Sequence, residues 1–268
     1  MNHSQRKNDK NYYTYKSNNI VEYYKKLSQL QLAEQTLITL LKDRLSTFKM
    51  LDMGIGGGRT TQYFAPLVKE YIGIDYSAEM IMACQQRLIN LSNSILLEVC
   101  DARNMHQFTN DSFDFILFSF NGIDYVNHQD RLKIIAEIKR VGKPGCYVLF
   151  SSHNLQSMAR QFNYKTHISF NPFTSYINLV MFGFLKLFNP GVTFQHLQTT
   201  DYLILRDESH NFRLQTYYIR PEAQIKQLEE SFDRIEIYSW KTGKKIVDKN
   251  DSALNSDLWL YYLCRVKA

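Results

Sequence analysis

The sequence has little of what marks several classes of protein. Only 5 of its 268 residues are Pro and 11 are Gly, and it contains no internal repeat, which excludes a collagen-like, repeat or disordered chain. The 4 Cys residues lie far apart in apolar surroundings, so we expect buried free thiols of a reducing compartment and no structural zinc site. The first sixteen residues lack the apolar core of a signal peptide, which favours a cytoplasmic location.

The positive charge is also not concentrated enough to define a nucleic-acid-binding surface. The 32 Lys and Arg residues exceed the 26 Asp and Glu residues by 6, mainly in the first fifty residues and between Lys241 and Lys249. Neither stretch is a dense basic run, and no Cys/His finger spacing accompanies it. Solvated surface explains the excess, and nucleic acid is disfavoured as a partner.

Aromatic residues are abundant by contrast, with 18 Tyr, 17 Phe and 2 Trp, so some rings are expected to line a pocket as well as to fill the core. One segment, Phe173–Phe188, is apolar on nearly every side and lies between two Asn-Pro pairs that favour helix boundaries. It is shorter than the roughly 20 residues that a bilayer span requires. We therefore predict no transmembrane span and a segment that is either buried under the domain or placed against another apolar surface.

Short apolar runs alternate with amphipathic stretches from residue 20 to 150, a pattern typical of a parallel sheet with crossover helices. This pattern predicts a doubly wound α/β fold. The predicted strands are Lys49–Met53, Tyr71–Asp75, Ile95–Val99, Phe113–Ser119 and Gly145–Ser151. The predicted helices are Glu22–Leu41, Arg59–Val68, Ala78–Leu91 and Gln129–Val141.

The alternation stops after Ser152 and resumes with a helix predicted at Pro221–Ser231. Between them, Tyr202–Arg206 and Phe212–Ile219 have the alternation of a β-hairpin, and two more strands are predicted at Asp233–Trp240 and Leu258–Val266. We thus expect a flexible polar N-terminus (1–20), a main domain (21–153 and 221–268) and an inserted cap (154–220).

A Gly-rich turn after the first strand is the strongest local sign of a ligand site. Gly54, Gly56 and Gly58 follow the apolar strand and precede a helix, so a ligand can approach the main chain there. A dinucleotide fingerprint requires its third Gly at position 59, where this chain has Arg59. That difference favours a nucleoside carrying an amino acid, whose ammonium Asp52 is placed to bind; a tight turn without a ligand is the alternative.

Acidic residues end the next two strands as well. Asp75 lies 21 positions after Gly54, where a carboxylate can accept hydrogen bonds from both ribose hydroxyls; capping the helix that starts near Ser77 is its alternative role. Asp101 ends the third strand, where it can accept a hydrogen bond from an adenine amino group. Three acids at three successive strand ends around a Gly-rich turn indicate a nucleoside site, because ligands of open α/β sheets bind along that edge.

With these residues the sequence resembles a class I S-adenosylmethionine-dependent methyltransferase across roughly residues 48–152. The matching segments are Leu51–Gly58, Ile74–Met80, Asp101-Ala102, Asp111–Asp114 and Ile138–Gly145. The resemblance implies seven strands in the order 3-2-1-4-5-7-6 with the last one antiparallel, and S-adenosylmethionine as the cofactor. It also implies roles by position.

Those implied roles cover the whole length of the cofactor. Gly54, Gly56 and Gly58 would lie against the methionine part and Asp75 on the ribose. Tyr76 and Met80 would contact the adenine faces, Asp101 and Ala102 its edge, and Phe120 and Asn121 the methionine moiety. Tyr23 or Tyr24 on the first helix would cover the cofactor.

The methyl acceptor is less defined by the sequence. The Asn/Asp-Pro-Pro-aromatic tetrapeptide that resembling nucleobase amine methyltransferases carry after the fourth strand is absent, so a small molecule is the expected acceptor. His153, just past the fifth strand, is the candidate general base, with capping of the strand end by His153 or Ser151 as its alternative role. No acid cluster supports a metal-dependent mechanism, so no metal is expected.

The sequence therefore predicts an enzyme that transfers a methyl group to oxygen or nitrogen of a small molecule, mainly by proximity and orientation. The aromatic residues of the cap fit an apolar or aromatic acceptor, although they can equally form the cap's own core or a dimer contact. The alternatives are an RNA or protein methyltransferase and a non-enzymatic cofactor-binding or membrane-associated module. Both a monomer and a homodimer are compatible with the sequence.

Overall fold

The structure is a computed structural model, and it describes residues 18–88, 95–208, 211–248 and 250–268. Most of the expected flexible N-terminus therefore lies outside the described residues. Its last three positions are helical instead, because helix α3 begins at Asn18 and runs to Lys26. None of the helices in this described part is both long and apolar enough to cross a membrane.

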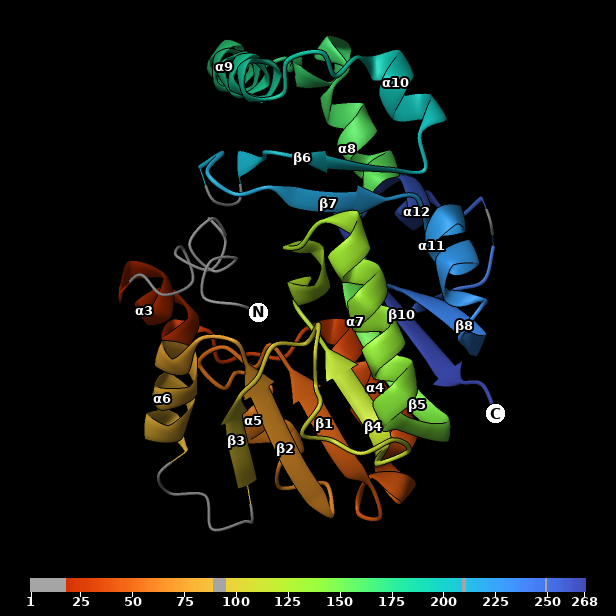
Figure 1. Cartoon of the computed structure of the whole chain (residues 1–268). Coiled ribbons are helices and arrows are strands. Elements are labelled where there is room, and N and C mark those ends of the chain that lie inside the picture. The colour runs from red at the N-terminus through yellow and green to blue at the C-terminus, as the bar shows by residue number, and fades with distance from the viewer. Residues whose placement is uncertain (1–17, 89–94, 209–210, 249) are drawn as a thin grey trace.

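A twisted sheet forms the centre of the main domain (Figure 1). Its strands run in the order β3-β2-β1-β4-β5-β10-β8-β9, and the first five are parallel. β10 pairs antiparallel with both β5 and β8, which confirms the predicted order of seven strands and the antiparallel last strand. The sheet is larger than predicted, because β9 and two strands of the cap bring it to ten strands in the described residues. These strands are β1 Lys49–Met53, β2 Glu70–Asp75, β3 Ile95–Val99, β4 Phe113–Phe118, β5 Gly142–Asn154, β8 Phe232–Ser239, β9 Lys245–Ile246 and β10 Trp259–Val266.

Helices cover both faces of this sheet because alternate residues of each strand point to opposite sides. On one face Met50 of β1 packs with Leu37 and Leu41 of a helix, and on the other Leu51 packs with Ile134 and Ile138. The helices of the main domain are α4 Leu32–Leu45, α5 Thr61–Phe64, α6 Ala78–Arg87, α7 His128–Val141, α11 Pro221–Leu228 and α12 Ser252–Ser256, with a 3-10 turn η1 at Gly122–Asp124.

Two predicted helices were wrong in their extent. The single helix expected at Glu22–Leu41 is interrupted between α3 and α4, because Gln31 is extended and begins α4 with a capping box in which Glu34 accepts its backbone N–H. The helix expected at Arg59–Val68 is reduced to α5. Pro66 lacks the N–H that a longer helix would need and disfavours its continuation.

The cap extends from the end of β5 to the start of α11, above the carboxyl ends of the parallel strands (Figure 1). It contains α8 Leu155–Gln161, a 3-10 turn η2 Tyr164–His167, α9 Pro172–Phe188, α10 Phe194–Thr199 and the strands β6 Tyr202–Leu205 and β7 Thr216–Ile219. β6 and β7 form the predicted hairpin, with a longer turn than expected. β7 also pairs in parallel with the end of β5, which joins the cap to the main sheet.

Candidate functional site

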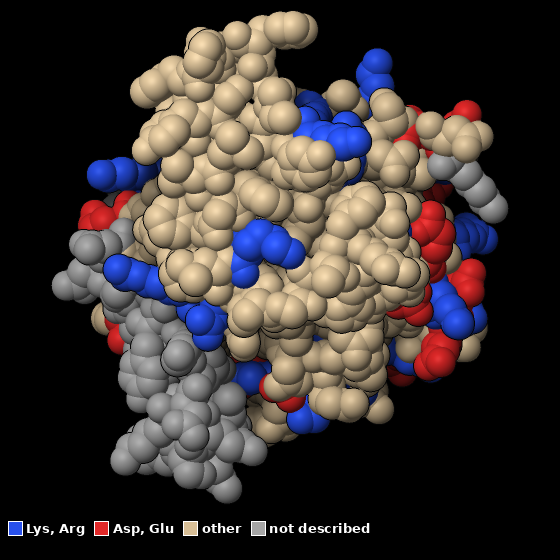
Figure 2. All heavy atoms as spheres, turned by 90° about the horizontal axis from the view of Figure 1, so that it is seen from above, with Lys and Arg blue, Asp and Glu red and all other residues tan. Residues whose placement is uncertain are grey.

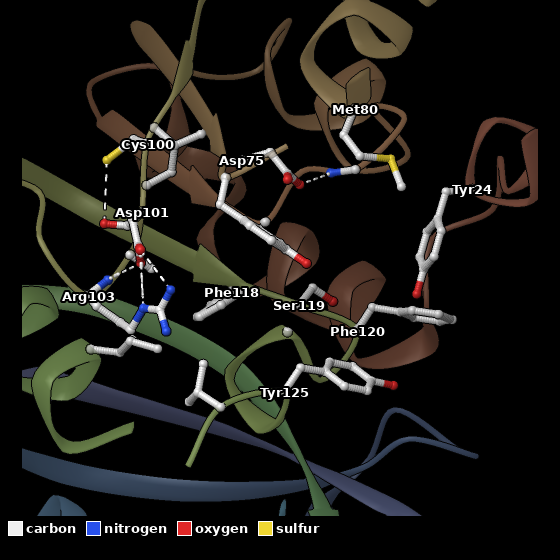
Figure 3. A pocket seen from close by; sticks show the side chains of 18 residues that line it. Tyr24, Asp75, Met80, Cys100, Asp101, Arg103, Phe118, Ser119, Phe120 and Tyr125 are labelled. Carbon is white, nitrogen blue, oxygen red and sulfur yellow. Dashed lines mark hydrogen bonds and ion pairs between the residues drawn. The ribbon is translucent and has the colours of Figure 1, made fainter. Parts of the chain in front are cut away.

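A pocket opens at the carboxyl ends of β1, β2 and β4, where the sequence predicts the ligand (Figure 3). Its empty space, counted together with the solvent at its mouth, is about 880 Å³. The predicted residues that line it are Gly54, Gly56, Asp75, Tyr76, Met80, Asp101, Ala102 and Phe120. Apolar side chains such as Ile74, Phe118 and Ile134 complete the wall.

The Gly-rich turn has the backbone that its sequence requires. Gly54, Gly56 and Gly58 all have positive φ, at 64°, 52° and 82°, a conformation that costs other residues free energy. Gly54 and Gly56 face the pocket, whereas Gly58 is not among its lining residues. A Cβ on Gly58 would lie 2.7 Å from the Cys84 Sγ, so this position needs glycine to pack against α6.

Asp75 lies at the end of β2 and is 6% exposed. One carboxylate oxygen accepts the Gly56 N–H (2.9 Å) and the other accepts the Ser77 N–H (2.9 Å), so the side chain ties the Gly-rich turn to the start of α6. Ser77, and not Asp75, is the N-cap that bonds to the Met80 N–H. Burial raises the pKa of Asp75 to about 6, and its backbone partners only partly offset this rise. A buried carboxylate in the pocket wall suits a ligand that donates hydroxyl hydrogen bonds.

Asp52 lines a smaller cavity that shares Tyr24, Gly54, Gly56 and Phe120 with the main pocket. One of its oxygens accepts hydrogen bonds from Thr60 (2.6 Å) and Tyr71 (2.6 Å). Burial raises the pKa of Asp52 to about 7 despite these donors. A cationic group of a ligand would favour its ionised form.

The third acid, Asp101, lies on the pocket wall but is already paired. Its two oxygens receive the Arg103 guanidinium, with an Nη2–Oδ2 distance of 2.8 Å, and the Arg103 N–H at 3.0 Å. Burial alone would raise the pKa of Asp101, but the Arg103 hydrogen bonds outweigh it and the pKa is lowered. Figure 3 shows this pair at the end of the pocket opposite Tyr24.

Aromatic rings close the opposite end of the pocket. Tyr24 of α3 packs edge-on against Phe120 with ring centroids 6.4 Å apart, and Tyr125 also lines the wall. Figure 3 shows Phe120 between the two tyrosines. Of the two tyrosines that the sequence proposed as a cover, Tyr24 therefore reaches the pocket, whereas Tyr23 packs against Tyr24 and is 53% exposed.

Arg59, the residue that departs from a dinucleotide fingerprint, is buried beside the Gly-rich turn. Its guanidinium makes two hydrogen bonds to Glu34 of α4, at 2.6 and 2.7 Å, and lies over the Phe120 ring. Ser119 and Tyr261 also donate to Glu34. Sequence reasoning missed this cluster, although Arg59 at an expected glycine position and the Gln31-x-x-Glu34 spacing were signals of it.

His153 lies within β5, one residue before its end, and not past the strand as predicted. Its Nδ1 is 2.7 Å from Asp124, whose carboxylate also accepts the His153 backbone N–H. Because a carboxylate only accepts, Nδ1 carries the proton and Nε2 accepts from the Asn121 amide 3.3 Å away. The Tyr125 ring, which lines the pocket, packs edge-on against the His153 ring at 6.3 Å.

Two neighbouring residues have roles that the sequence did not indicate. Asp124 is fully buried and pairs with Arg131 of α7, which is also fully buried. Ser152 donates to the same carboxylate. The helix pattern gave no sign that Arg131 points inward, so this ion pair could not be predicted.

Asn121 is the residue whose hydrogen bonds are incomplete. Its backbone N–H donates to Ser151, its amide nitrogen to His153, and its φ is 61°. Its Oδ1 is buried and has no hydrogen-bond partner among the described residues. An unpaired buried acceptor costs free energy, so this atom suits a ligand with an N–H or O–H group. Asn121 itself is not among the residues that line the two cavities. The acceptors that the cavities offer are the Asp75 and Asp52 carboxylates, which suit the ribose and the ammonium of S-adenosylmethionine.

Comparisons with known proteins agree with this geometry. A family model described as a methyltransferase domain matches residues 50–145. Phosphoethanolamine N-methyltransferase 1 of Arabidopsis thaliana is 34% identical over 106 residues, which are 39% of this chain. The chain spans only 21% of the length of that plant enzyme.

The solved structures extend the likeness to the fold of most of the chain. An S-adenosylmethionine-dependent methyltransferase from Mesorhizobium loti has a TM-score of 0.58 at 15% identity, covering 87% of this chain and 97% of that one. The N-methyltransferase NodS from Bradyrhizobium japonicum, in complex with S-adenosylhomocysteine, has a TM-score of 0.53 at 17% identity and covers 93% and 98%. At such identities the likeness concerns the fold alone.

Proposed function

Because the chain belongs, through residues 50–145 and its sheet topology, to the class I S-adenosylmethionine-dependent methyltransferases, we propose that it methylates a nitrogen or oxygen of a small molecule. The observation that carries the proposal is a pocket with a buried hydrogen-bonded chain beside it. The nucleoside-type pocket at the strand ends meets the Asn121–His153–Asp124 hydrogen-bonded chain through the Tyr125 ring. Nitrogen is the favoured target, since the plant enzyme that matches 39% of this chain is named as an N-methyltransferase.

Each pocket residue has a role in this proposal. Asp75 accepts the ribose hydroxyls, Asp52 accepts the methionine ammonium, and Gly54 and Gly56 allow the ligand to approach the main chain. Asn121, behind the pocket wall, holds His153 through its amide. Tyr76 and Met80 enclose the adenine. The Asp101 carboxylate already accepts hydrogen bonds from the Arg103 guanidinium. In this proposal Asp101 therefore positions Arg103 at the adenine end of the pocket, and it contacts the base less directly than the resemblance implied.

When bound, S-adenosylmethionine supplies an activated methyl group on a sulfonium. The protein's part is then to hold the acceptor in line, to exclude water with the Tyr24, Phe120 and Tyr125 rings, and to remove a proton if the acceptor arrives protonated. His153 is suited to that removal because Asp124 fixes its Nδ1–H and leaves the Nε2 lone pair toward Asn121. Asn121 must release Nε2 for the proton to be taken.

The proposal is tested by methyl transfer from labelled S-adenosylmethionine to a panel of small amines and alcohols that includes phosphoethanolamine. We expect S-adenosylhomocysteine and a methylated amine in equal amounts. Bound S-adenosylmethionine with no turnover on any acceptor would indicate a non-enzymatic module and refute the proposal.

His153→Asn keeps a donor near Asp124 but has no base at the Nε2 position. We expect it to lower kcat about 10²-fold or more without changing cofactor affinity, a typical effect of losing a general base. His196→Ala, on an exposed residue of α10, is the matched control. Equal turnover of the two variants would leave His153 with a structural role only.

An RNA or protein acceptor has less support. Two lysines of the C-terminal basic stretch are paired, Lys241 with Asp257 and Lys245 with Glu236, while Lys249 lies outside the described residues. Total RNA and a protein extract therefore serve as negative controls in the acceptor panel. All four cysteines are buried and free, which supports a reducing compartment such as the cytoplasm.

A further inference from the structure

The helix α9 leaves most of its apolar side chains in solvent. Of its 17 residues only Leu185 is buried, and Phe173 and Leu187 are 71% and 69% exposed. α9 lies at the end of the molecule farthest from the main sheet, beyond the β6–β7 hairpin (Figure 1). Exposed apolar residues gathered on one element mark an interaction surface more often than scattered ones do.

These side chains share one side of the helix. Six of the exposed apolar residues lie on a single face, since each is three, four or seven positions from another of them: Phe173, Tyr176, Ile177, Val180, Phe184 and Leu187. Leu179 and Phe188 are exposed as well. The opposite side, with Asn178, Met181, Phe182 and Leu185, lines a small cavity inside the cap. The helix therefore has an inner face packed on the cap and an outer face, defined here by the six exposed residues, that lies mostly in solvent. Phe184, at its edge, also contacts the Phe212 ring. Ile168 and Phe170, just before α9, extend that exposed surface.

The chain segment that contains this outer face carries charge of one sign. No Asp or Glu occurs between residues 138 and 200, whereas Arg160, Lys165 and Lys186 are exposed on the cap. The first acid after this stretch, Asp201, is exposed just before β6, and the next two, Asp207 and Glu208, line the cavity on the inner side of the helix. Seen from above, most of the surface is formed by uncharged residues, with separate Lys and Arg groups among them. The Asp and Glu groups lie toward the edges of this view (Figure 2).

We propose that the outer face of α9 binds the surface of an anionic lipid bilayer. The apolar stripe would enter the boundary between headgroups and acyl chains, where the three cap cations meet anionic headgroups. A helix of 17 residues is about 26 Å long, shorter than the roughly 30 Å hydrocarbon core. It lies in the plane of the interface and does not cross it.

A second copy of the chain fits this surface less well. A two-fold dimer through α9 would place the same patch of each subunit against the other. The exposed cations of the two caps would then face each other without an acid between residues 138 and 200 to neutralise them. A lipid surface with negative headgroups has the complementary charge.

Vesicle co-sedimentation of the full-length chain tests the proposal, with one set of vesicles of phosphatidylcholine alone and one of equal parts phosphatidylcholine and phosphatidylglycerol. We expect binding to the anionic vesicles and much weaker binding to the neutral ones. Phe173→Ser/Leu187→Ser should weaken binding about 10²-fold, since each side chain contributes roughly tenfold through burial. Lys165→Gln/Lys186→Gln should weaken it about 25-fold, since each cation contributes roughly fivefold.

The matched control is Leu40→Ser/Met82→Ser, which removes apolar residues of 56% and 53% exposure from α4 and α6. It should bind vesicles as the unaltered chain does, and unchanged thermal unfolding of all variants shows that they remain folded. Equal binding of the α9 variant and the control would overturn the proposal. So would a chain that ignores vesicles but forms a dimer that Phe173→Ser/Leu187→Ser dissociates, since that result assigns the surface to a second copy.

Discussion

The acid at the end of β2 predicts a defined pH dependence of cofactor binding. The pKa of Asp75 is raised by burial to about 6, and ribose hydroxyls donate to the ionised carboxylate. Between pH 7.5 and pH 5 the ionised fraction of such a group falls about tenfold. Affinity for S-adenosylhomocysteine should fall by the same factor, because the ribose hydroxyls donate to the ionised form of the carboxylate.

Asp52 adds a second, separable part to that dependence. Its pKa of about 7 implies an ionised fraction that falls about 80-fold over the same pH range. Isothermal titration of S-adenosylhomocysteine at several pH values measures the combined effect of both carboxyls on the binding free energy. Asp75→Asn should weaken binding and remove the part with a midpoint near 6, and Asp52→Asn should remove the part near 7. A wild-type affinity that is flat from pH 5 to pH 7.5 would refute both assignments.

The stability of the ligand-free chain should change in the opposite direction. Both carboxyls have folded pKa values above the ordinary 3.8, so the folded chain keeps protons that the unfolded chain has already lost. Their contribution to the free energy of unfolding therefore decreases as the pH rises from about 4 to about 7. Protonation of these two carboxyls at low pH therefore weakens ligand binding without destabilising the fold. Thermal unfolding at each pH checks this expectation.

Three further substitutions have expected outcomes that thermal or denaturant unfolding measures. Gly58→Ala should destabilise the protein and weaken cofactor binding, because the new Cβ would meet the Cys84 Sγ at a φ of 82°. Gly183→Ala should stabilise it by roughly 0.5–1 kcal/mol, since a Cβ in this helix interior meets nothing within 4 Å; a loss of stability would contradict that reading. Glu34→Gln should cost about 3–5 kcal/mol by leaving buried Arg59 uncompensated, and a cost under 1 kcal/mol would show that the pair is dispensable.

Much of the fold could be predicted because its determinants are local. The strands β1 and β3 have the predicted bounds, since an apolar run ends there at a polar or Gly-rich turn. The break between α3 and α4 was not predicted, because it depends on Glu34 serving both the Gln31 cap and the distant Arg59.

The candidate site was also predictable only in part. The residues placed by the strand ends, Gly54, Gly56, Asp75 and Asp101, lie on the pocket wall as expected. The pairing of Asp101 with Arg103 and the Asp124–Arg131 ion pair depend on side-chain directions that periodicity does not encode.

The central claim is tested most directly by incubating the chain with methyl-labelled S-adenosylmethionine and fractionated small metabolites, and identifying the labelled product by mass. The account predicts a methylated small molecule formed together with an equal amount of S-adenosylhomocysteine, lost in Asp75→Ala and kept in Gly183→Ala. Label that appears only in RNA or protein, or no transfer while S-adenosylmethionine remains bound, would contradict it.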